Sequence, residues 1–220
     1  FLIPLIYFYF SKKIKADYLK KCYLIFTLIL FQGLVGWYMV KSGLVNDVTV
    51  SHYRLSIHLL TAFFIISIIF WLRKNFIYQK NKIFFAFSKE NLVFQILIVL
   101  IFLQIILGAF VSGLDAGKIY QTWPLMGENF LPNDLILTNS LSLIEFDNHS
   151  LVQFYHRNLA YIIILYSIFL AIYIYKKKII ELYKPFKFLI IFLLLQVILG
   201  VFTLISGLNI LLASIHQITS

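Results

Sequence analysis

Sulfur and carboxylate side chains, which bind many metals in proteins, are scarce in this chain. Its 220 residues include one cysteine, two methionines and nine acids. A lone cysteine, Cys22, cannot form a disulfide or a thiolate metal cluster within this chain, and so little sulfur argues against a copper site. No GxGxxG loop occurs, so nothing in the sequence indicates a bound dinucleotide.

Charge is also missing from long stretches of the sequence. Four uncharged runs approach or exceed the ~20 residues that cross a bilayer, namely residues 22–40, 55–72, 91–114 and 158–175. A fifth stretch, residues 188–220, is too long for one helix, and SGLN at 206–209 divides it into a helix and the start of another. With 61% hydrophobic residues and a mean hydropathy of +0.91, the composition predicts an all-α polytopic membrane protein.

We interpret the two ends of the chain as cuts inside helices. Residues 1–10 are apolar but make only half a span. A basic cluster follows them, whereas a signal peptide carries its basic residues first. The last helix stops after about ten residues. The chain is therefore expected to be a fragment of a longer protein.

The net charge of +10 has a distribution typical of membrane proteins. Fifteen of the 19 basic residues lie in alternate loops, whereas the remaining loops hold four basic residues and six of the nine acids. This positive-inside pattern predicts that the basic loops face the cytoplasm or a mitochondrial matrix. It favours the lipid bilayer, and not nucleic acid, as the partner of the positive charge.

The histidines lie at the outer ends of the predicted helices. His58, His156 and His216 sit several residues inside alternate helices, roughly 6–9 Å below the helix start at ~1.5 Å per residue. Ionisable groups within membrane helices are scarce and usually functional, although a helix-to-helix hydrogen bond explains any single one. His52 and His149 lie at the interface or in a loop, where a solvated side chain is expected.

Haem iron is the metal that best fits three histidines at one depth. Zinc prefers four compact ligands, commonly with cysteine or carboxylate, and no acid accompanies these histidines inside the helices. Haem needs only two axial imidazoles from facing helices and an apolar slot. Arg54 lies one turn before His58, and Arg157 directly follows His156. Either arginine could pair with a haem propionate or, alternatively, anchor its helix at the membrane interface.

An internal repeat organises the chain. QGLVGWYMVKSGL from Gln32 and QVILGVFTLISGL from Gln196 share Gln, Gly, Ser, Gly and Leu at identical spacing, with an offset of 164 residues. QIILGAFVSG from Gln104 repeats the Gln-x-x-x-Gly opening. Small residues let membrane helices approach closely, so packing is the simplest interpretation. Because a histidine also follows each long repeat, we predict two tandem four-helix bundles, residues 1–90 and 91–220, the second including an outer loop at 114–150.

Several of these stretches resemble the haem A synthase family. GAFVSGLDAGKIYQTWPLMGENFLP and VQFYHRNLAYIIIL look like its central signatures. GLVGWYMVKSGL with VSHYRLSIHLL is similar to its form in alphaproteobacteria and mitochondria. The resemblance covers nearly the whole chain. It implies an eight-helix protein of a bacterial inner membrane, or alternatively the mitochondrial inner membrane, with about six helices and parts of others present here and the histidine layer toward the outer face.

The resemblance implies an oxidoreductase that converts the C8 methyl of haem O to the formyl group of haem A for terminal oxidases. His156 and His216 would bind a haem b cofactor in the second bundle. Arg157 beside His156 and Arg54 beside His58 are expected, from their positions, to be further haem-binding residues. His58 would be the catalytic residue, an iron ligand at the substrate haem of the first bundle. Haem O synthase and a separate electron donor are the implied partners, and a homo-oligomer stays open.

The resemblance also places the partner of His58, and a glutamate before it, upstream of Phe1. His156 precedes the inner residue Lys176 by 20 positions, and the same spacing before Lys12 predicts a His-Arg pair about nine residues before the chain begins.

The outer loop is expected to serve as a lid over the histidine layer. Tyr120, Trp123 and Phe130 would settle at the interface and cap the haem edges, while glycines and prolines shape the turns. The alternative is a linker with an aromatic belt. Two other functions compete: an electron-transfer cytochrome b without substrate turnover, and a transporter. A transporter would use acids near the midplane, which these runs lack.

Overall fold

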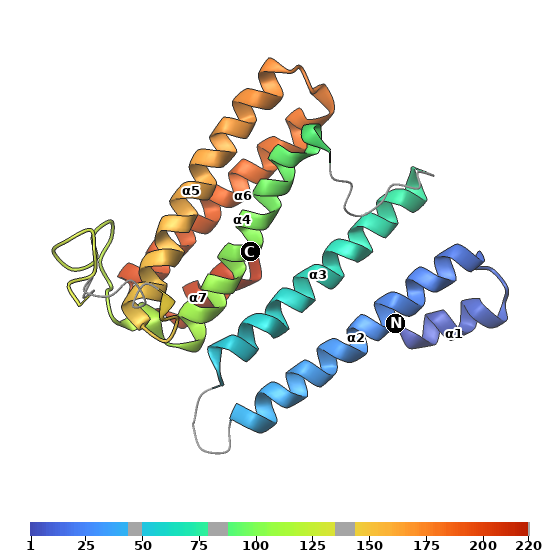
Figure 1. The fold of residues 1–220 in the computed structure, drawn as a ribbon, viewed down its shortest axis with the longest axis horizontal. Coiled ribbons are helices and arrows are strands. Elements are labelled where there is room, and N and C mark those ends of the chain that lie inside the picture. The colour runs from blue at the N-terminus through green and yellow to red at the C-terminus, as the bar shows by residue number, and fades with distance from the viewer. Residues whose placement is uncertain (44–49, 79–87, 135–143, 220) are drawn as a thin grey trace. The chain divides into compact units, whose positions relative to one another are not determined.

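The computed structural model describes residues 1–43, 50–78, 88–134 and 144–219. Within these ranges it has seven α-helices, one short 3-10 helix and an isolated β-bridge between Met126 and Asn129 (Figure 1). Five of these helices are long and apolar enough to cross a membrane. The predicted class, an all-α protein with several membrane spans, is confirmed. The chain separates into two compact units, residues 1–87 and 88–220.

The first unit is built on a helical hairpin. It contains α1 (Leu2–Phe10), α2 (Ala16–Gly43) and α3 (His52–Ile77). α2 and α3 run antiparallel and pack along their length, and α1 contacts α2 (Figure 1). The rings of Tyr18 and Phe76 meet edge to face at 5.4 Å and join the two helices at one end.

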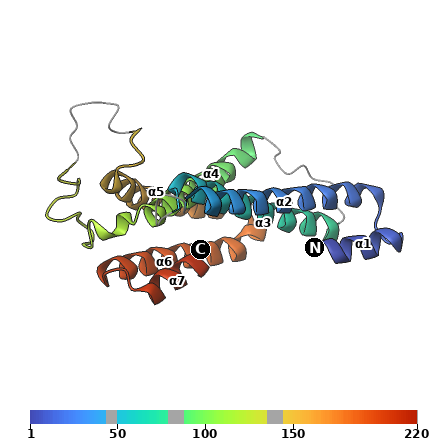
Figure 2. The same ribbon diagram turned by 90° about the horizontal axis from the view of Figure 1, so that it is seen from below.

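The second unit contains the remaining helices, α4 (Lys89–Gly113), η1 (Ala116–Lys118), α5 (His149–Lys176), α6 (Ile180–Ile205) and α7 (Ile210–Thr219). α4 packs on α5, α5 on α6, and α6 on α7. Figure 2 shows α6 and α7 on one side of the α4–α5 pair. Within this unit, η1 contacts both α4 and α5 at the start of the outer loop.

Local sequence signals set the helix boundaries in the second unit. The side chains of Ser88 and Asn148 accept hydrogen bonds from the amides of Asn91 and Leu151, at 3.2 and 3.0 Å, and so cap α4 and α5. The break expected at SGLN is confirmed, because α6 ends at Ile205 and α7 begins at Ile210. Gly207 there has φ +73°, a left-handed conformation that glycine adopts without strain.

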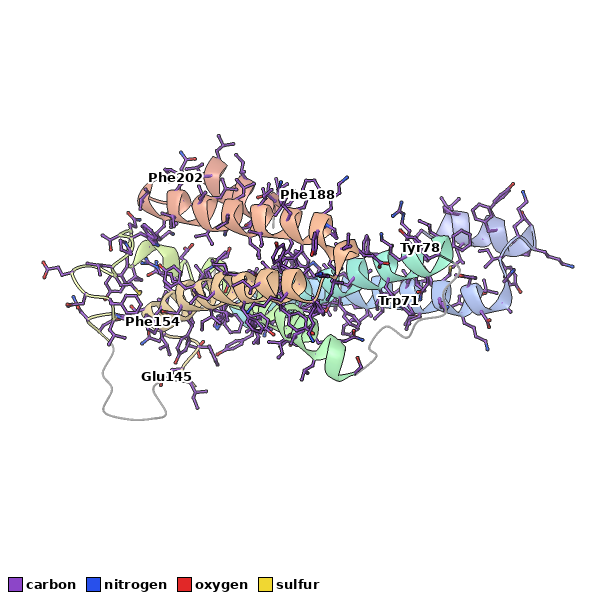
Figure 3. The ribbon with its side chains drawn as sticks, turned by 90° about the horizontal axis from the view of Figure 1, so that it is seen from above. Trp71, Tyr78, Glu145, Phe154, Phe188 and Phe202 are labelled. Carbon is purple, nitrogen blue, oxygen red and sulfur yellow. The ribbon has the colours of Figure 1, made fainter. Side chains whose placement is uncertain are left out.

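Apolar packing holds the second unit together. Leu97 on α4 and Ile163 and Leu170 on α5 form a buried cluster, and side chains from α6 pack against it. Large apolar residues elsewhere face outward, as Phe188 and Phe202 on α6 do, each about half exposed (Figure 3). Lipid is as apolar as these side chains, so close packing, and not escape from water, stabilises such a bundle.

Replacing Leu170 with Ala is expected to destabilise the second unit by roughly 2 kcal/mol or more, because a fully buried leucine leaves a cavity when truncated. Leu165→Ala on the same helix is the matched control, since Leu165 is 67% exposed. Unfolding of the purified proteins in mixed detergent micelles measures the stability of both variants. Equal loss of stability in the two variants would contradict this packing.

Candidate functional site

In the first unit, His58 on α3 lies against the backbone of α2. A Cβ added at Gly36 would stand only 2.9 Å from His58 Cε1, so the imidazole occupies the space that a side chain would fill. Four residues earlier, Gln32 Nε2 donates to the main-chain oxygen of His58 at 2.9 Å and lies 3.2 Å from His58 Nε2. One glutamine therefore contacts both the ring and the main chain of the histidine.

His156 on α5 has the same surroundings in the second unit. A Cβ at Gly108 on α4 would lie 3.2 Å from His156 Cε1. Gln104 Nε2 donates to the main-chain oxygen of His156 at 3.1 Å and lies 3.2 Å from its Nδ1. The distances match those around His58 to within a few tenths of an ångström.

His216 on α7 repeats the glycine contact but not the contact with the glutamine side chain. A Cβ at Gly200 on α6 would lie 3.2 Å from His216 Cε1. Gln196 Nε2 instead reaches Thr219 Oγ1 at 2.6 Å, one turn beyond the histidine on the same helix. His156 on α5 and His216 on α7 belong to the same compact unit, on helices that both pack against α6.

Several polar atoms at these histidines are buried and lack a hydrogen-bond partner. They are the Nδ1 atoms of His58 and His216, and the Oε1 atoms of Gln32 and Gln104. An unpaired polar atom in an apolar interior is costly unless it serves a ligand. The described residues contain no group of three or more His, Cys, Asp or Glu that could hold a metal ion. What they offer is single or paired imidazoles in an apolar setting, the donor set that haem iron takes.

Arg157 holds the outer loop. Its Nη1 donates to the carbonyl oxygens of Thr122 and Leu125, at 2.9 and 3.2 Å, and its Nη2 donates to that of Tyr120 at 2.8 Å. Its Nε is buried without a hydrogen-bond partner. The guanidinium therefore ties three loop carbonyls to α5 and keeps its buried Nε–H for an acceptor such as a carboxylate.

The loop is fastened to α5 at further points. Trp123 Nε1 donates to Tyr161 Oη at 2.9 Å, and Gln153 Nε2 donates to the Tyr120 carbonyl at 2.9 Å. The ring of Phe130 meets Phe154 edge to face at 6.0 Å. The expectation that Tyr120, Trp123 and Phe130 cap a haem is not tested by these contacts, which show the three residues seated on α5.

Asp134 closes the described part of the loop. Tyr120 Oη donates to its Oδ1 at 2.9 Å and Ser150 Oγ donates to its Oδ2 at 2.6 Å. Burial acts to raise the pKa of Asp134, but the hydrogen bonds from Ser150 and Tyr120 outweigh it and hold this pKa below its ordinary value. The charged carboxylate therefore stabilises the loop.

The remaining candidate residues take different positions. Arg54 lies over the ring of Tyr38 at 5.0 Å, a cation–π contact within the α2–α3 hairpin. His149 is exposed, as expected for the helix entrance. The expectation of a solvated His52 is wrong, because His52 is only 6% exposed and its ring lies tilted against that of Tyr53, with the ring centroids 4.0 Å apart.

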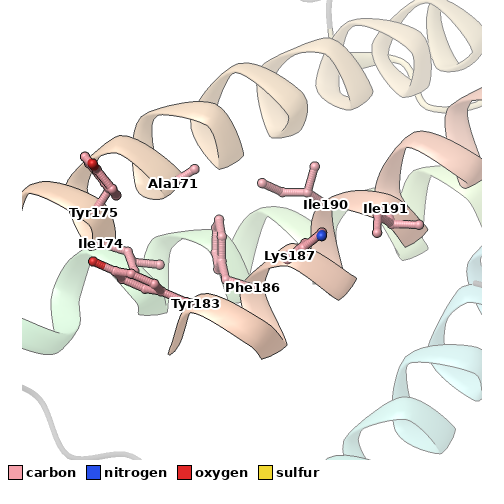
Figure 4. Close-up of a pocket in the computed structure, with 8 residues that line it drawn as sticks. All are labelled: Ala171, Ile174, Tyr175, Tyr183, Phe186, Lys187, Ile190 and Ile191. Atoms are coloured by element: carbon pink, nitrogen blue, oxygen red, sulfur yellow. The ribbon is translucent and has the colours of Figure 1, made fainter. Parts of the chain in front are cut away.

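An apolar hollow lies at the other end of the second unit. Ile174, Phe186 and Ile190 line it, with Lys187 beside them (Figure 4). Ile174 in its wall is 18 positions beyond His156 along α5 (174 − 156), or about 27 Å at ~1.5 Å per residue. This hollow is therefore separate from the histidine site.

Sequence reasoning found the histidines and missed what surrounds them. The Gln-x-x-x-Gly spacing was visible, but it also suits plain helix packing. The loop anchors Gln153 and Tyr161 lie inside the stretch VQFYHRNLAYIIIL, and Ser150 lies two residues before it, but the sequence gave no sign that they hold the loop. The acceptors of Arg157 are main-chain carbonyls, which leave no signature in a sequence.

Comparison with known proteins identifies relatives along the whole chain. The family model COX15-CtaA, described as cytochrome oxidase assembly protein, matches residues 1–220. A protein named Heme A synthase from Pelagibacter ubique is 44% identical over 100% of this chain and 64% of its own length. Those from Rickettsia prowazekii and Flavobacterium johnsoniae are 40% and 36% identical, each over 99% of this chain and 64% of their own lengths. The chain thus spans slightly less than two thirds of these relatives. No solved structure matches it.

Lowering the pH is expected to loosen the outer loop through Asp134. Since the folded pKa is depressed, the stabilisation is complete above the ordinary carboxyl value of about 4 and is lost as pH falls through the lowered value. Fluorescence of Trp123, with Trp37 and Trp71 changed to Phe, should shift to the red over that range. Asp134→Asn should flatten this response.

Asp115→Asn is the control for the pH experiment, because Asp115 pairs with Lys118 on the exposed side of the same loop. It should leave the pH profile unchanged. A wild-type profile in Asp134→Asn would contradict the role of this carboxylate.

Proposed function

Because the chain belongs to the COX15-CtaA family of cytochrome oxidase assembly proteins, we propose that it forms the haem-binding core of a haem A synthase, which oxidises the C8 methyl of haem O to a formyl group. The resemblance drawn from the sequence is confirmed at the level of the family. A single observation carries the proposal: the rings of His58, His156 and His216 each lie against a glycine of the preceding helix.

The second unit is the proposed site of a haem b cofactor. His156 and His216 lie on different helices of one compact unit, and both helices pack against α6. His216 has a buried Nδ1 without a partner. The surrounding α4–α7 surfaces are apolar, as a porphyrin requires. A haem held by two imidazoles supplies electron transfer.

The first unit is the proposed substrate side. His58 would bind the iron of haem O and is the residue we assign to catalysis there, with Arg54 near it at the helix entrance. Replacing a methyl by a formyl group removes two hydrogens and adds one oxygen. As a monooxygenase reaction, this consumes two O₂ molecules, four electrons and four protons and releases three water molecules, and a separate electron donor must supply the four electrons. The apolar helices suit the hydrocarbon tail of haem O.

The outer loop is proposed to shield the second site from water. Arg157 connects it to the helix turn that carries His156, and the free Nε of Arg157 can donate to a haem propionate. The distribution of basic residues supports an orientation with this loop on the outer face of a bacterial inner membrane. Haem O synthase as a neighbour, a separate redox partner and a homo-oligomer belong to the same proposal.

Co-expression with a haem O synthase tests the activity directly. Mass spectrometry of the extracted haems should show haem A when the full-length protein is present and only haem O when it is absent. If the protein retains haem b yet produces no haem A, it is an electron-transfer cytochrome and the proposed activity is wrong.

Substitution tests the ligand pair. His156→Ala and His216→Ala should each abolish the low-spin bis-imidazole spectrum of the second unit, because one iron needs both ligands. His149→Ala should preserve it, since His149 is exposed at the start of α5. Optical and electron paramagnetic resonance (EPR) spectra of the purified variants make the comparison. An unchanged spectrum in His216→Ala would rule the pairing out.

A further inference from the structure

The same arrangement of three residues occurs in three helical hairpins. A helix carries Gln and, four residues later, Gly; the next helix carries His against that glycine. The three sets are Gln32, Gly36 and His58; Gln104, Gly108 and His156; and Gln196, Gly200 and His216. Glycine and histidine are 22, 48 and 16 residues apart (58 − 36, 156 − 108, 216 − 200). Connections of such different length do not dictate the contact, so the facing helices must hold it in register.

We propose that the Gln-x-x-x-Gly motif is a positioning device that fixes the direction of each haem-ligating imidazole. The inference rests on the proposed function. It assigns these glutamines and glycines a role beyond close helix packing, as residues that act on the iron through the histidines.

The glycines provide room for the rings. At Gly36 a Cβ would come within 2.9 Å of the imidazole, a distance that real Cβ atoms do not show, and at Gly108 and Gly200 the distance is a tight 3.2 Å. Gly33 lies about one turn before Gly36 on α2. A Cβ added at Gly33 would have nothing within 4 Å. Glycine weakens a helix relative to alanine, and the ring contact explains why it stands at the fifth position of the motif.

The atom at which each ring meets its glycine sets the direction in which the ring nitrogens point. In all three hairpins the nearest ring atom is Cε1, which is bonded to both ring nitrogens. Contact at Cε1 therefore sets where the lone pairs of Nδ1 and Nε2 point. A methyl group at the glycine would turn or displace the ring, and with it any iron bound to a nitrogen.

The glutamines fix the main chain from which the ring extends. Gln32 and Gln104 donate to the carbonyl oxygen of the histidine itself, at 2.9 and 3.1 Å. Gln196 holds α7 one turn further on, through Thr219. Residues that orient a metal ligand in this way typically change metal affinity 10–100-fold when replaced, and they tune the properties of a bound haem.

The test uses the full-length protein and substitutions that each add one methyl to a helix. Gly108→Ala and Gly200→Ala should shift the low-spin EPR signal of the haem in the second unit. They should also raise the rate of haem loss to an apo-globin acceptor roughly 10-fold. Gly33→Ala is the matched control and should leave both readouts at wild-type values, because its methyl meets open space. Wild-type spectra and retention in Gly108→Ala and Gly200→Ala would overturn the proposal.

A second variant covers the case in which these alanines prevent folding. Gln104→Leu keeps the bulk of the side chain and removes the hydrogen bond to His156, and it should shift the same EPR signal. An unchanged signal would overturn the role of the glutamine. Gly36→Ala, compared with Gly33→Ala on the same helix, should lower binding of added haem O roughly 10-fold.

The outcomes separate this inference from the proposed function. If the wild-type protein makes haem A while every variant matches its spectrum, the positioning role fails alone. If the wild-type protein makes no haem A but the glycine variants shift its haem b signal, the activity fails and the positioning role stands. A wild-type protein that binds no haem overturns both.

Discussion

The structure depends on fitting an imidazole between two helices that are otherwise apolar. Packed helices lie 8–10 Å apart, so a ring can enter the space only where the facing helix has no side chain, and glycine supplies that gap at Gly36, Gly108 and Gly200. No water reaches such a place to satisfy polar atoms, so a partner must come from the neighbouring helix. Gln32 and Gln104 supply it one helical turn away. Space and hydrogen bonding thus come from one short stretch of the partner helix.

In the second unit, the residue that follows the histidine also anchors the outer loop. Arg157 follows His156, so the two side chains leave α5 in different directions, the imidazole toward Gly108 and the guanidinium toward the carbonyls of Tyr120, Thr122 and Leu125. A shift of this helix turn would disturb both sets of contacts together. Asp134 holds the far side of the loop through Tyr120 and Ser150, and burial together with this hydrogen bond raises the pKa of Tyr120. The loop is therefore fixed by polar contacts at both of its described ends.

The sequence predicts the helices well because bilayer thickness leaves a direct trace in composition. Uncharged runs gave the long helices, and the glycine of SGLN gave the break at Gly207. The site is harder, since Gln-x-x-x-Gly reads equally well as packing until the register of the facing helix is known. The burial of His52 could not be predicted for a similar reason. Its position at the start of α3 suggested a solvated side chain, but its burial depends on the segments that pack around it. Main-chain acceptors, such as those of Arg157, are invisible in any residue pattern.

The repeated glycine–imidazole contact also indicates which structural element is repeated along the chain. An offset of 164 residues relates Gln32 to Gln196 and indicates a repeat that spans several helices. Yet α4 and α5, which lie between these two copies, contain the same glycine–imidazole contact. Their connection includes the outer loop, whereas α6 and α7 are joined by a short turn. The contact survives this difference because it depends on the register of two antiparallel helices and not on how they are joined. A two-helix hairpin is thus the smallest element that contains the whole arrangement. Connections of different length join its two helices while the glycine–imidazole contact is kept, and the longest of the three lies between Gly108 and His156 in the second unit.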